Sequence, residues 1–186
     1  MAKVLEIAEL GQPVLKEKAL DVENIHDGAV QELINNLIET AFNSHGVGIA
    51  APQVFEPYRI FIINSRPSPR YPNAPEIGPM AIINPEITSY SDEKEKDWEG
   101  CLSIPGIRGL VPRHRSIVAR YSRRDGSTRE MEFSDFTARI FQHEYDHING
   151  VLFLDRMESS HELVTEKEYQ RLMMRAMEEK SGEAGL

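Results

Sequence analysis

Two histidines four residues apart, with a glutamate after the first, form the pattern in this chain that is best suited to chemistry. They are His143, Glu144 and His147, in the run QHEYDH at 142–147. Positions i and i+4 of an α-helix lie about 40° apart around the axis, so both imidazoles project from one face. Two neutral imidazoles can bind one divalent ion there, and a neighbouring carboxylate can take a proton from an activated water. The alternative is a structural histidine pair.

A catalytic ion usually has three protein ligands and a water, so the pair needs a third partner. The chain offers four other histidines, many carboxylates and a single thiol, Cys101. Cys101 lies in WEGCLSIPG at 98–106, an irregular segment bounded by glycine and proline, where a loop or an edge strand could present it. The alternative for a single cysteine is a small buried apolar residue.

The spacing of apolar residues predicts the elements that must position these side chains. Residues 28–44 have helical spacing that should stop at Gly46, and residues 136–149, which carry the histidine pair, should form a helix that closes at Gly150. The other predictions are strands at 59–63 and 81–83, an exposed proline-rich loop at 65–79, a hairpin of 116–122 with 128–133, and a charged amphipathic helix at 161–180. Strands in the middle and helices at the ends indicate an α+β protein with a mostly antiparallel sheet.

Two further motifs accompany the histidine pair, GVGIAAPQ at 46–53 and EGCLS at 99–103. With QHEYDH they occur complete and in order, and together they resemble the peptide deformylase family over most of the chain. The resemblance implies a single catalytic domain over 1–186, with mostly antiparallel sheets packed around a central HExxH helix and a C-terminal helix at about 161–180. It also implies a metal-dependent hydrolase that removes the N-formyl group from the N-terminal formylmethionine of nascent proteins and releases formate.

By the same resemblance, Cys101, His143 and His147 hold one divalent metal ion, with water in the fourth position. Fe(II) is typical of the family, and Zn, Ni or Co are accepted; a thiolate with two imidazoles suits several of these ions. Glu144 resembles the general base that deprotonates the water. Gln53 and the backbone N–H of Leu102 resemble donors to the formyl oxygen as it gains negative charge.

The resemblance also assigns the contacts to the substrate. The Gly48 carbonyl accepts the formyl-amide N–H, and the backbone at Val47 and Gly100 pairs with the peptide main chain. Val47 and Ile140 are the best-matched residues to line the methionine pocket. Phe136 and Trp98 are further candidates for the lining, and the polar residues Arg139 and Asp97 fall near the same pocket. All of these apolar residues are equally plausible as core.

Composition limits the partners. The formal net charge is −9, which argues against binding DNA or other nucleic acid, because phosphate binding needs clustered positive charge. Arg120, Arg123 and Arg124 flank the Asp125-Gly126 turn and are expected to be solvated. With one cysteine and no apolar stretch near the ~20 residues that cross a bilayer, we expect a cytoplasmic protein without membrane contact.

The predicted C-terminal helix raises the question of a second partner, the ribosome, in addition to the N-formyl-methionyl nascent peptides. In some bacterial members of the family it docks on the ribosome surface. Here its mixed charges favour a solvated helix that is packed by an apolar stripe of Leu163, Tyr169, Leu172, Met173 and Met177.

Two other functions share part of this pattern. A zinc metalloprotease also has HExxH but usually takes its third ligand downstream of the helix, so Cys101 discriminates between the two. A binding module with a structural metal would need neither Glu144 nor Gln53. We also hypothesise a buried cluster of Glu99, Arg113 and Asp146 that fixes the Cys101 segment against the helix; solvation of all three at the surface is the alternative.

Overall fold

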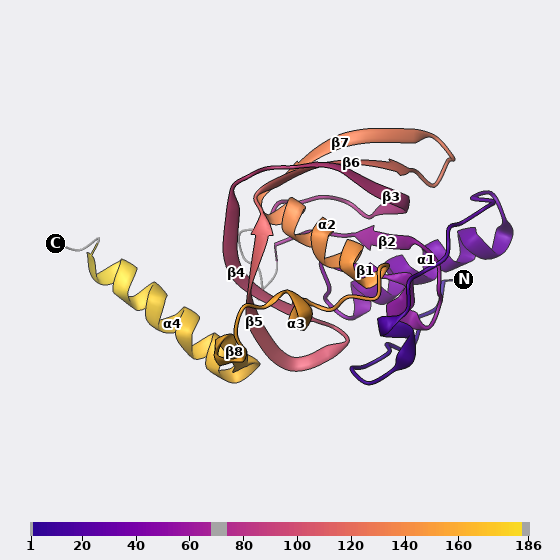
Figure 1. Ribbon diagram of the computed structural model, residues 1–186. Helices are drawn as coiled ribbons and strands as arrows, with labels where there is room; N and C mark the ends of the chain where they lie inside the picture. The colour runs from indigo at the N-terminus through magenta and orange to yellow at the C-terminus, as the bar shows by residue number, and fades with distance from the viewer. Residues whose placement is uncertain (1, 68–73, 184–186) are drawn as a thin grey trace.

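The computed structural model describes residues 2–67 and 74–183, with helices near both ends of the chain and strands between them (Figure 1). The helices are η1 (Pro13–Lys16), α1 (Gly28–Asn43), η2 (Ala51–Val54), α2 (Asp135–His147), α3 (Phe153–Arg156), η3 (Ser160–Glu162) and α4 (Glu166–Glu183), where η marks a 3-10 helix. The strands are β1 (Gly48–Ala50), β2 (Ile60–Ile63), β3 (Met80–Tyr90), β4 (Lys94–Cys101), β5 (Ile104–His114), β6 (Ser116–Ser122), β7 (Thr128–Ser134) and β8 (Leu163–Thr165).

Two antiparallel sheets surround the helix that carries the histidine pair. One has the order β1-β2-β3-β6-β7 and the other the order β4-β5-β8, and every adjacent pair in both is antiparallel. Helix α2 contacts strands of both sheets and lies between them in Figure 1. The α+β class, the mostly antiparallel sheets and the central helix are therefore confirmed.

An aromatic cluster holds α2 against the larger sheet. Phe141 of α2 is fully buried, and its ring lies 5.0 Å from that of Phe61 and 4.8 Å from that of Phe133, measured between centroids. Burying such a side chain contributes about 1.5–3 kcal/mol. These apolar contacts fix the rotation of α2 about its axis. The face that carries His143 and His147 is therefore turned towards the smaller sheet.

The first predicted helix is confirmed, but a different residue ends it. His45, with φ 53°, adopts the left-handed conformation that the sequence suggested for Gly46. The N–H of His45 donates to the carbonyl of Phe42 at 3.3 Å, and that of Gly46 to the carbonyl of Ala41 at 3.0 Å. This is the Schellman arrangement of a helix C-terminus, with histidine in the position usually taken by glycine.

The predicted strands and the hairpin are present, and the strand content is larger than predicted. β3 continues from the predicted 81–83 to Tyr90 through Asn84, which has φ 48°, and through irregularities in its pairing with β6. β4 and β5 were not predicted as strands. β4 begins with the charged run KEKD and β5 contains glycine and proline, so both have a low intrinsic β-propensity.

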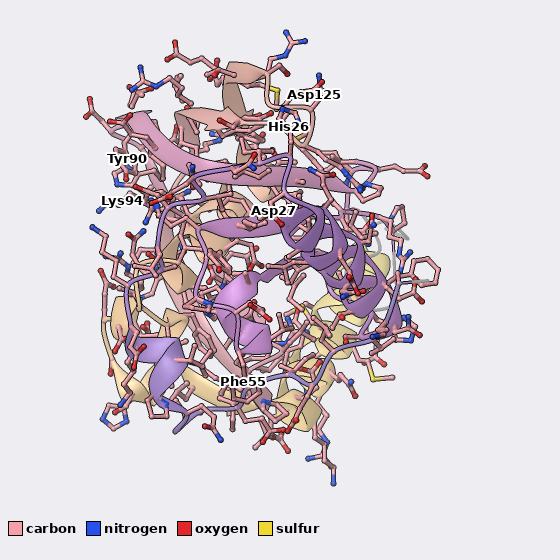
Figure 2. The ribbon with its side chains drawn as sticks, turned by 90° about the vertical axis from the view of Figure 1, so that its right-hand side faces the viewer. His26, Asp27, Phe55, Tyr90, Lys94 and Asp125 are labelled. Carbon is pink, nitrogen blue, oxygen red and sulfur yellow. The ribbon has the colours of Figure 1, made fainter. Side chains whose placement is uncertain are left out.

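The tip of the β6–β7 hairpin packs against the segment before α1 (Figure 2). A Cβ on Gly126, which has φ 80°, would lie 2.9 Å from Nε2 of His26, and Figure 2 shows His26 beside Asp125. Arg124 donates from Nε to Oε1 of Gln31 at 2.6 Å. The neighbouring arginines at 120 and 123 keep half-exposed side chains, as expected of a solvated hairpin.

The C-terminal prediction is partly wrong. Residues 161–165 are not part of the α-helix: the first two end the 3-10 helix η3, the next three form β8, which pairs with β5, and α4 begins only at Glu166. Leu163 therefore belongs to a strand and not to a helical stripe. From the body of the protein α4 leads away towards the C-terminus (Figure 1). Leu172 is 39% and Met177 61% exposed, whereas Leu163, Tyr169 and Met173 are partly buried, so the stripe is packed only in part.

Part of the proline-rich segment predicted as an exposed loop, 68–73, lies outside the described residues. Its described parts, 65–67 and 74–79, contain no helix or strand, as predicted. Ser65 and Ala74 are nevertheless buried, so the loop is exposed only in part.

Candidate metal centre

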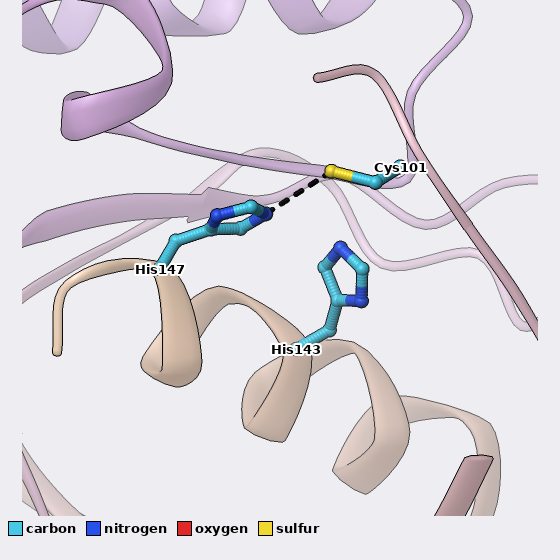
Figure 3. Close-up of side chains that lie close together, drawn as sticks. All are labelled: Cys101, His143 and His147. Atoms are coloured by element: carbon cyan, nitrogen blue, oxygen red, sulfur yellow. Dashed lines mark hydrogen bonds between the residues drawn. The ribbon is translucent and has the colours of Figure 1, made fainter. Parts of the chain in front are cut away.

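Three possible metal ligands meet between α2 and the end of β4 (Figure 3). One ligand atom from each of Cys101, His143 and His147 lies within 4.8 Å of the others, and Sγ of Cys101 is 3.2 Å from Nε2 of His147. The two rings project from successive turns of α2 towards the sulfur, with 5.0 Å between their centroids. Cys101 is 4% and His147 1% exposed.

The β4–β5 hairpin positions the sulfur of Cys101 next to the two histidines. Gly100 pairs with Arg108, but the next residue, Cys101, pairs with Ile104, so the ladder is irregular at this point. In the turn that follows, the N–H of Ser103 donates to Sγ of Cys101 at 3.4 Å. The cysteine is thus the last residue of an edge strand, one of the two settings that the sequence left open.

Gln53, in η2, lies directly beside the sulfur. Its Oε1 accepts the N–H of Ala50 at 2.9 Å, which fixes the orientation of the amide. Its Nε2 donates to Oγ of Ser103 at 3.1 Å and to Sγ of Cys101 at 3.4 Å. Ser103 is the last residue of the EGCLS motif, but the sequence assigned it no role. Leu102, which lies between Cys101 and Ser103 in the turn, is partly buried.

The surroundings favour a thiolate at Cys101. Burial raises the pKa of the thiol, but His147 and His143 together hold that pKa well below its ordinary value. Burial likewise lowers the pKa of His143, yet the hydrogen bonds to Cys101 and Glu99 raise it well above the usual value. The thiolate is the form of cysteine that binds metals.

Glu144 occupies the space next to Gly48. A Cβ on Gly48 would overlap Oε1 of Glu144, so a larger residue at this position would displace the carboxylate. Burial raises the pKa of Glu144 to about 7, against the lowering effect of His143 and His147. Oε2 is buried without a hydrogen-bond partner among the described residues. The carboxylate is therefore close to the ligands and suited to accepting a proton near neutral pH.

The hypothesised cluster of Glu99, Arg113 and Asp146 is confirmed. Arg113 donates to both carboxylate oxygens of Glu99, at 2.8 and 3.0 Å, and to Asp146 at 2.5 Å, and all three are buried. Glu99 also accepts a hydrogen bond from Nδ1 of His143 at 2.9 Å. The other ring nitrogen, Nε2, is therefore the atom of His143 that is available to bind a metal together with Cys101. Arg113 and His143 hold the pKa of Glu99 far below its usual range, although burial raises it.

Two arginines that were not assigned to this cluster extend it. Arg139 donates to Glu99 at 3.0 Å and to the carbonyl groups of Val111 and Glu95. Arg156 of α3 donates to both oxygens of Asp146, at 3.1 and 2.7 Å. The ion pairs therefore join β4, β5, α2 and α3 around the candidate ligands.

One pocket brings together nearly all the residues that the sequence assigned to the site. Its lining comprises His45, Gly46, Val47, Gly48, Gln53, Trp98, Glu99, Gly100, Cys101, Leu102, Phe136, Arg139, Ile140, His143 and Glu144. His147 is not part of this lining and lies buried behind it. Among the described residues, Asp97 does not contribute to the wall, whereas Gly46, which was expected to serve the helix end, and its neighbour His45 do.

The model of the polypeptide deformylase family matches residues 4–162. The chain belongs to the polypeptide deformylase family. This family comprises metal-dependent enzymes that remove the N-formyl group from the N-terminal formylmethionine of nascent peptides. The match includes all three motifs and ends just before β8 and α4.

Similar proteins cover most of the chain. Peptide deformylase 2 of Nostoc sp. is 56% identical over 171 residues, which are 92% of this chain and 96% of the relative. Peptide deformylase 2 of Shewanella oneidensis is 43% identical over 154 residues, 83% of this chain and 84% of the relative. The crystal structure of a class I type b peptide deformylase from Acinetobacter baumannii with bound Met-Ala-Ser superposes with a TM-score of 0.82 at 42% identity, covering 84% of this chain and all of that one.

The residues present fit a divalent ion. One thiolate and two imidazoles form a donor set that Zn²⁺, Fe²⁺ and similar ions accept. Ligand bonds of about 2.0–2.3 Å place donor atoms roughly 3.3–3.8 Å apart, which agrees with atoms that already lie within 4.8 Å of one another. Oε2 of Glu144, which is buried and has no hydrogen-bond partner in the described part of the chain, also fits a site that holds an ordered water beside the ion.

Proposed function

We propose that this chain hydrolyses the formamide bond of N-formyl-methionyl peptides at the Cys101, His143 and His147 centre and releases formate. One observation carries the proposal: the sulfur of Cys101 from β4, two imidazoles from α2 and the Glu144 carboxylate converge beside a single pocket. A zinc metalloprotease has no need of a cysteine ligand, and a binding module has no need of a buried carboxylate.

The metal would be one divalent ion per chain, with Fe(II) as the native ion and Zn, Ni or Co as substitutes. The soft thiolate and the two imidazoles support this set, because it excludes the oxygen-preferring ions Ca²⁺ and Mg²⁺. When bound, the ion supplies a Lewis acid that acidifies water and polarises the formyl carbonyl.

Glu144 would act as the general base and then as the general acid. Its carboxylate takes the proton of the attacking water at one Oε atom and returns it to the departing amine nitrogen. Burial, which raises the pKa of Glu144, supports both steps because it favours uptake of a proton by the carboxylate.

Gln53 and Leu102 would stabilise the negative charge that develops on the formyl oxygen. Nε2 of Gln53 donates to Oγ of Ser103 and to Sγ of Cys101, and we assign the N–H on the Cys101 side to the substrate, because it lies beside a candidate metal ligand. The backbone N–H of Leu102 stands one peptide unit from Cys101, which fixes its position relative to the ion. Such donors are typically worth about 2.7–4 kcal/mol each in the transition state.

The peptide would bind as a short strand along the cleft. Within the described sheet β4 pairs with β5 only, so its other edge, at Gly100, is open for main-chain hydrogen bonds. Across the pocket, the Gly48 carbonyl would accept the formamide N–H, and the backbone of Val47 would pair with the peptide. Ile140 and Val47 would line the pocket for the methionine side chain.

The partners are then formylated nascent peptides, and the cytoplasm, where such chains are made, is the proposed location. A contact between α4 and the ribosome surface remains a prediction. The net charge of −9 argues against a DNA partner. None of the helices in the described residues is both long and apolar enough to cross a membrane.

Formate release from formyl-Met-Ala-Ser tests the proposal directly. We expect formate and free Met-Ala-Ser in equal amounts from anaerobically purified protein. Cleavage of the Met-Ala bond would instead indicate a protease, and binding without any product would indicate a binding module; either result would contradict the proposal.

A further inference from the structure

The base of α4 touches one wall of the pocket. Trp98 lines the pocket, and its ring lies 5.7 Å from that of Tyr169, with an interplanar angle of 63°. Tyr169 belongs to α4 and lies outside residues 4–162, which match the family model. A residue beyond the family match therefore supports a wall residue of the site.

Tyr169 itself is firmly held. The guanidinium carbon of Arg108 lies 4.4 Å from the centre of the Tyr169 ring, and the Arg108 side chain is fully buried. Arg108 donates to both carboxylate oxygens of Glu166, at 2.8 and 3.1 Å. β8 also pairs with β5 immediately before α4 begins. The first turn of α4 is thus fixed to the β4–β5 hairpin, while its later residues extend into solvent.

The alternation of side chains along β4 indicates which part of a peptide would meet Trp98. Glu99 and Cys101 face α2, so Trp98 and Gly100 belong to the opposite face of the strand. A peptide added along the open edge of β4 alternates in the same way. If its first side chain enters the pocket beside α2, its second side chain projects on the face that carries the indole.

We propose that Trp98, positioned by Tyr169, forms a subsite for the second residue of the formyl-methionyl peptide and favours a large apolar side chain there. This inference rests on the proposed function. Tyr169 is a positioning residue, because it acts through the indole and does not touch the peptide. Packing of an apolar side chain against an aromatic ring changes the affinity for the peptide by roughly two- to tenfold.

The kinetic test compares formyl-Met-Leu-Ser with formyl-Met-Ala-Ser. In the wild type we expect a lower KM for the leucine peptide and equal kcat values. Tyr169→Ala should lower the ratio of the KM for the alanine peptide to the KM for the leucine peptide by roughly two- to tenfold, without changing kcat. Tyr169→Phe should restore the wild-type ratio. Met174→Ala, at a 65% exposed position of the same helix, is the matched control and should behave as the wild type.

Fluorescence supplies a second readout, because Trp98 is the only tryptophan of the chain. Its emission should shift to longer wavelength in Tyr169→Ala, but not in Met174→Ala, and binding of the product Met-Leu-Ser should change the emission of the wild type. Trp98→Ala should remove the leucine preference even if Tyr169→Ala does not fold. An unchanged KM ratio in both variants would overturn the subsite alone, whereas a wild type that releases no formate from either peptide would overturn the proposed function as well.

Discussion

Gly48 shows how closely the site constrains a single residue. Its backbone does not require glycine through its dihedral angles; instead, Oε1 of Glu144 lies where a Cβ would be. The three-motif pattern drew attention to this residue for its carbonyl group. The structure adds a steric reason: strand β1 must pass this close to α2 for the carboxylate to reach the pocket.

Gly48→Ala should therefore displace Glu144 and lower kcat. We expect a loss of at least tenfold with the metal content unchanged, because the ligands are not touched. Gly78→Ala is the matched control, since a Cβ there meets nothing within 4 Å. Equal kcat values for the two variants would show that the carboxylate has room to move and that its position is not decisive.

Glu144→Gln tests the proposed base. The amide keeps the volume of the side chain but cannot accept a proton, so we expect kcat to fall by roughly 10²–10⁴-fold. The ion should remain, because Glu144 is not among the three ligands that meet around one point. Formate release and elemental analysis of the same preparation check both statements. A variant that keeps kcat within threefold of the wild type would remove Glu144 from the mechanism.

At the scale of elements, the Arg113 cluster joins the strand that carries Cys101 to the helix that carries the histidines. Arg113, on β5, pairs with Glu99 on β4 and with Asp146 on α2, and Glu99 orients the ring of His143. Buried ion pairs of this kind contribute little net stability when complete, but losing one partner leaves charges uncompensated. The cluster therefore fixes geometry more than it adds stability.

Arg113→Ala should lower the free energy of unfolding by about 3–5 kcal/mol and reduce the metal content together with kcat. Arg115→Ala is the control: its ion pairs with Glu93 and Asp135 are at the surface, where solvent screens them, so removing them should leave the free energy of unfolding nearly unchanged. Denaturant unfolding and elemental analysis provide the comparison. If Arg113→Ala retained wild-type metal content and activity, the positioning role of the cluster would be wrong.

Elements with strong periodicity or turn chemistry could be predicted from the sequence, and elements held by long-range pairing could not. The helix spacing of α1 and α2 and the Asp125-Gly126 turn are local signals. β4 and β5 have charged, glycine and proline residues in place of β-formers, and each is stabilised as a strand by its partner across the hairpin. The start of α4 was placed too early, because Leu163 fits the spacing of the helix although its backbone pairs with β5.

The same distinction applies to the site. Residues within motifs, such as Cys101 and Gln53, could be named in advance because their neighbours in sequence identify them. The roles of Ser103, although it lies in a motif, and of Arg156 could not be predicted, since they arise from hydrogen bonds that form only in the folded chain. The Glu99–Arg113–Asp146 cluster could be hypothesised because two of its members adjoin ligands and carry charges that burial would force to pair.

At the scale of the whole molecule, the candidate ligands come from the two structures that the fold must hold together. Cys101 belongs to the three-stranded sheet, while His143 and His147 belong to the helix packed on the five-stranded sheet. An ion bound by all three therefore links the two sheets through α2. Binding to the folded state alone stabilises it in proportion to the logarithm of the ion concentration over Kd.

Removal of the metal with a chelator should lower Tm by roughly 5–10 °C, which corresponds to about 2.7 kcal/mol for an ion present at a hundred times its Kd. Adding Zn²⁺ or, without oxygen, Fe²⁺ should restore the original Tm. Thermal unfolding followed by circular dichroism makes the comparison, with the chelator alone on a metal-free sample as control. An unchanged Tm would mean that the ion does not connect the two parts of the fold.

Elemental analysis of anaerobically purified Cys101→Ala beside the wild type tests the central claim most directly. If the thiolate and the two imidazoles hold one ion, the wild type should contain about one divalent ion per chain and the variant close to none, with the secondary structure of both unchanged. A folded Cys101→Ala protein that retains a full equivalent of metal would contradict the account, because the histidines would then bind the ion with some other third ligand.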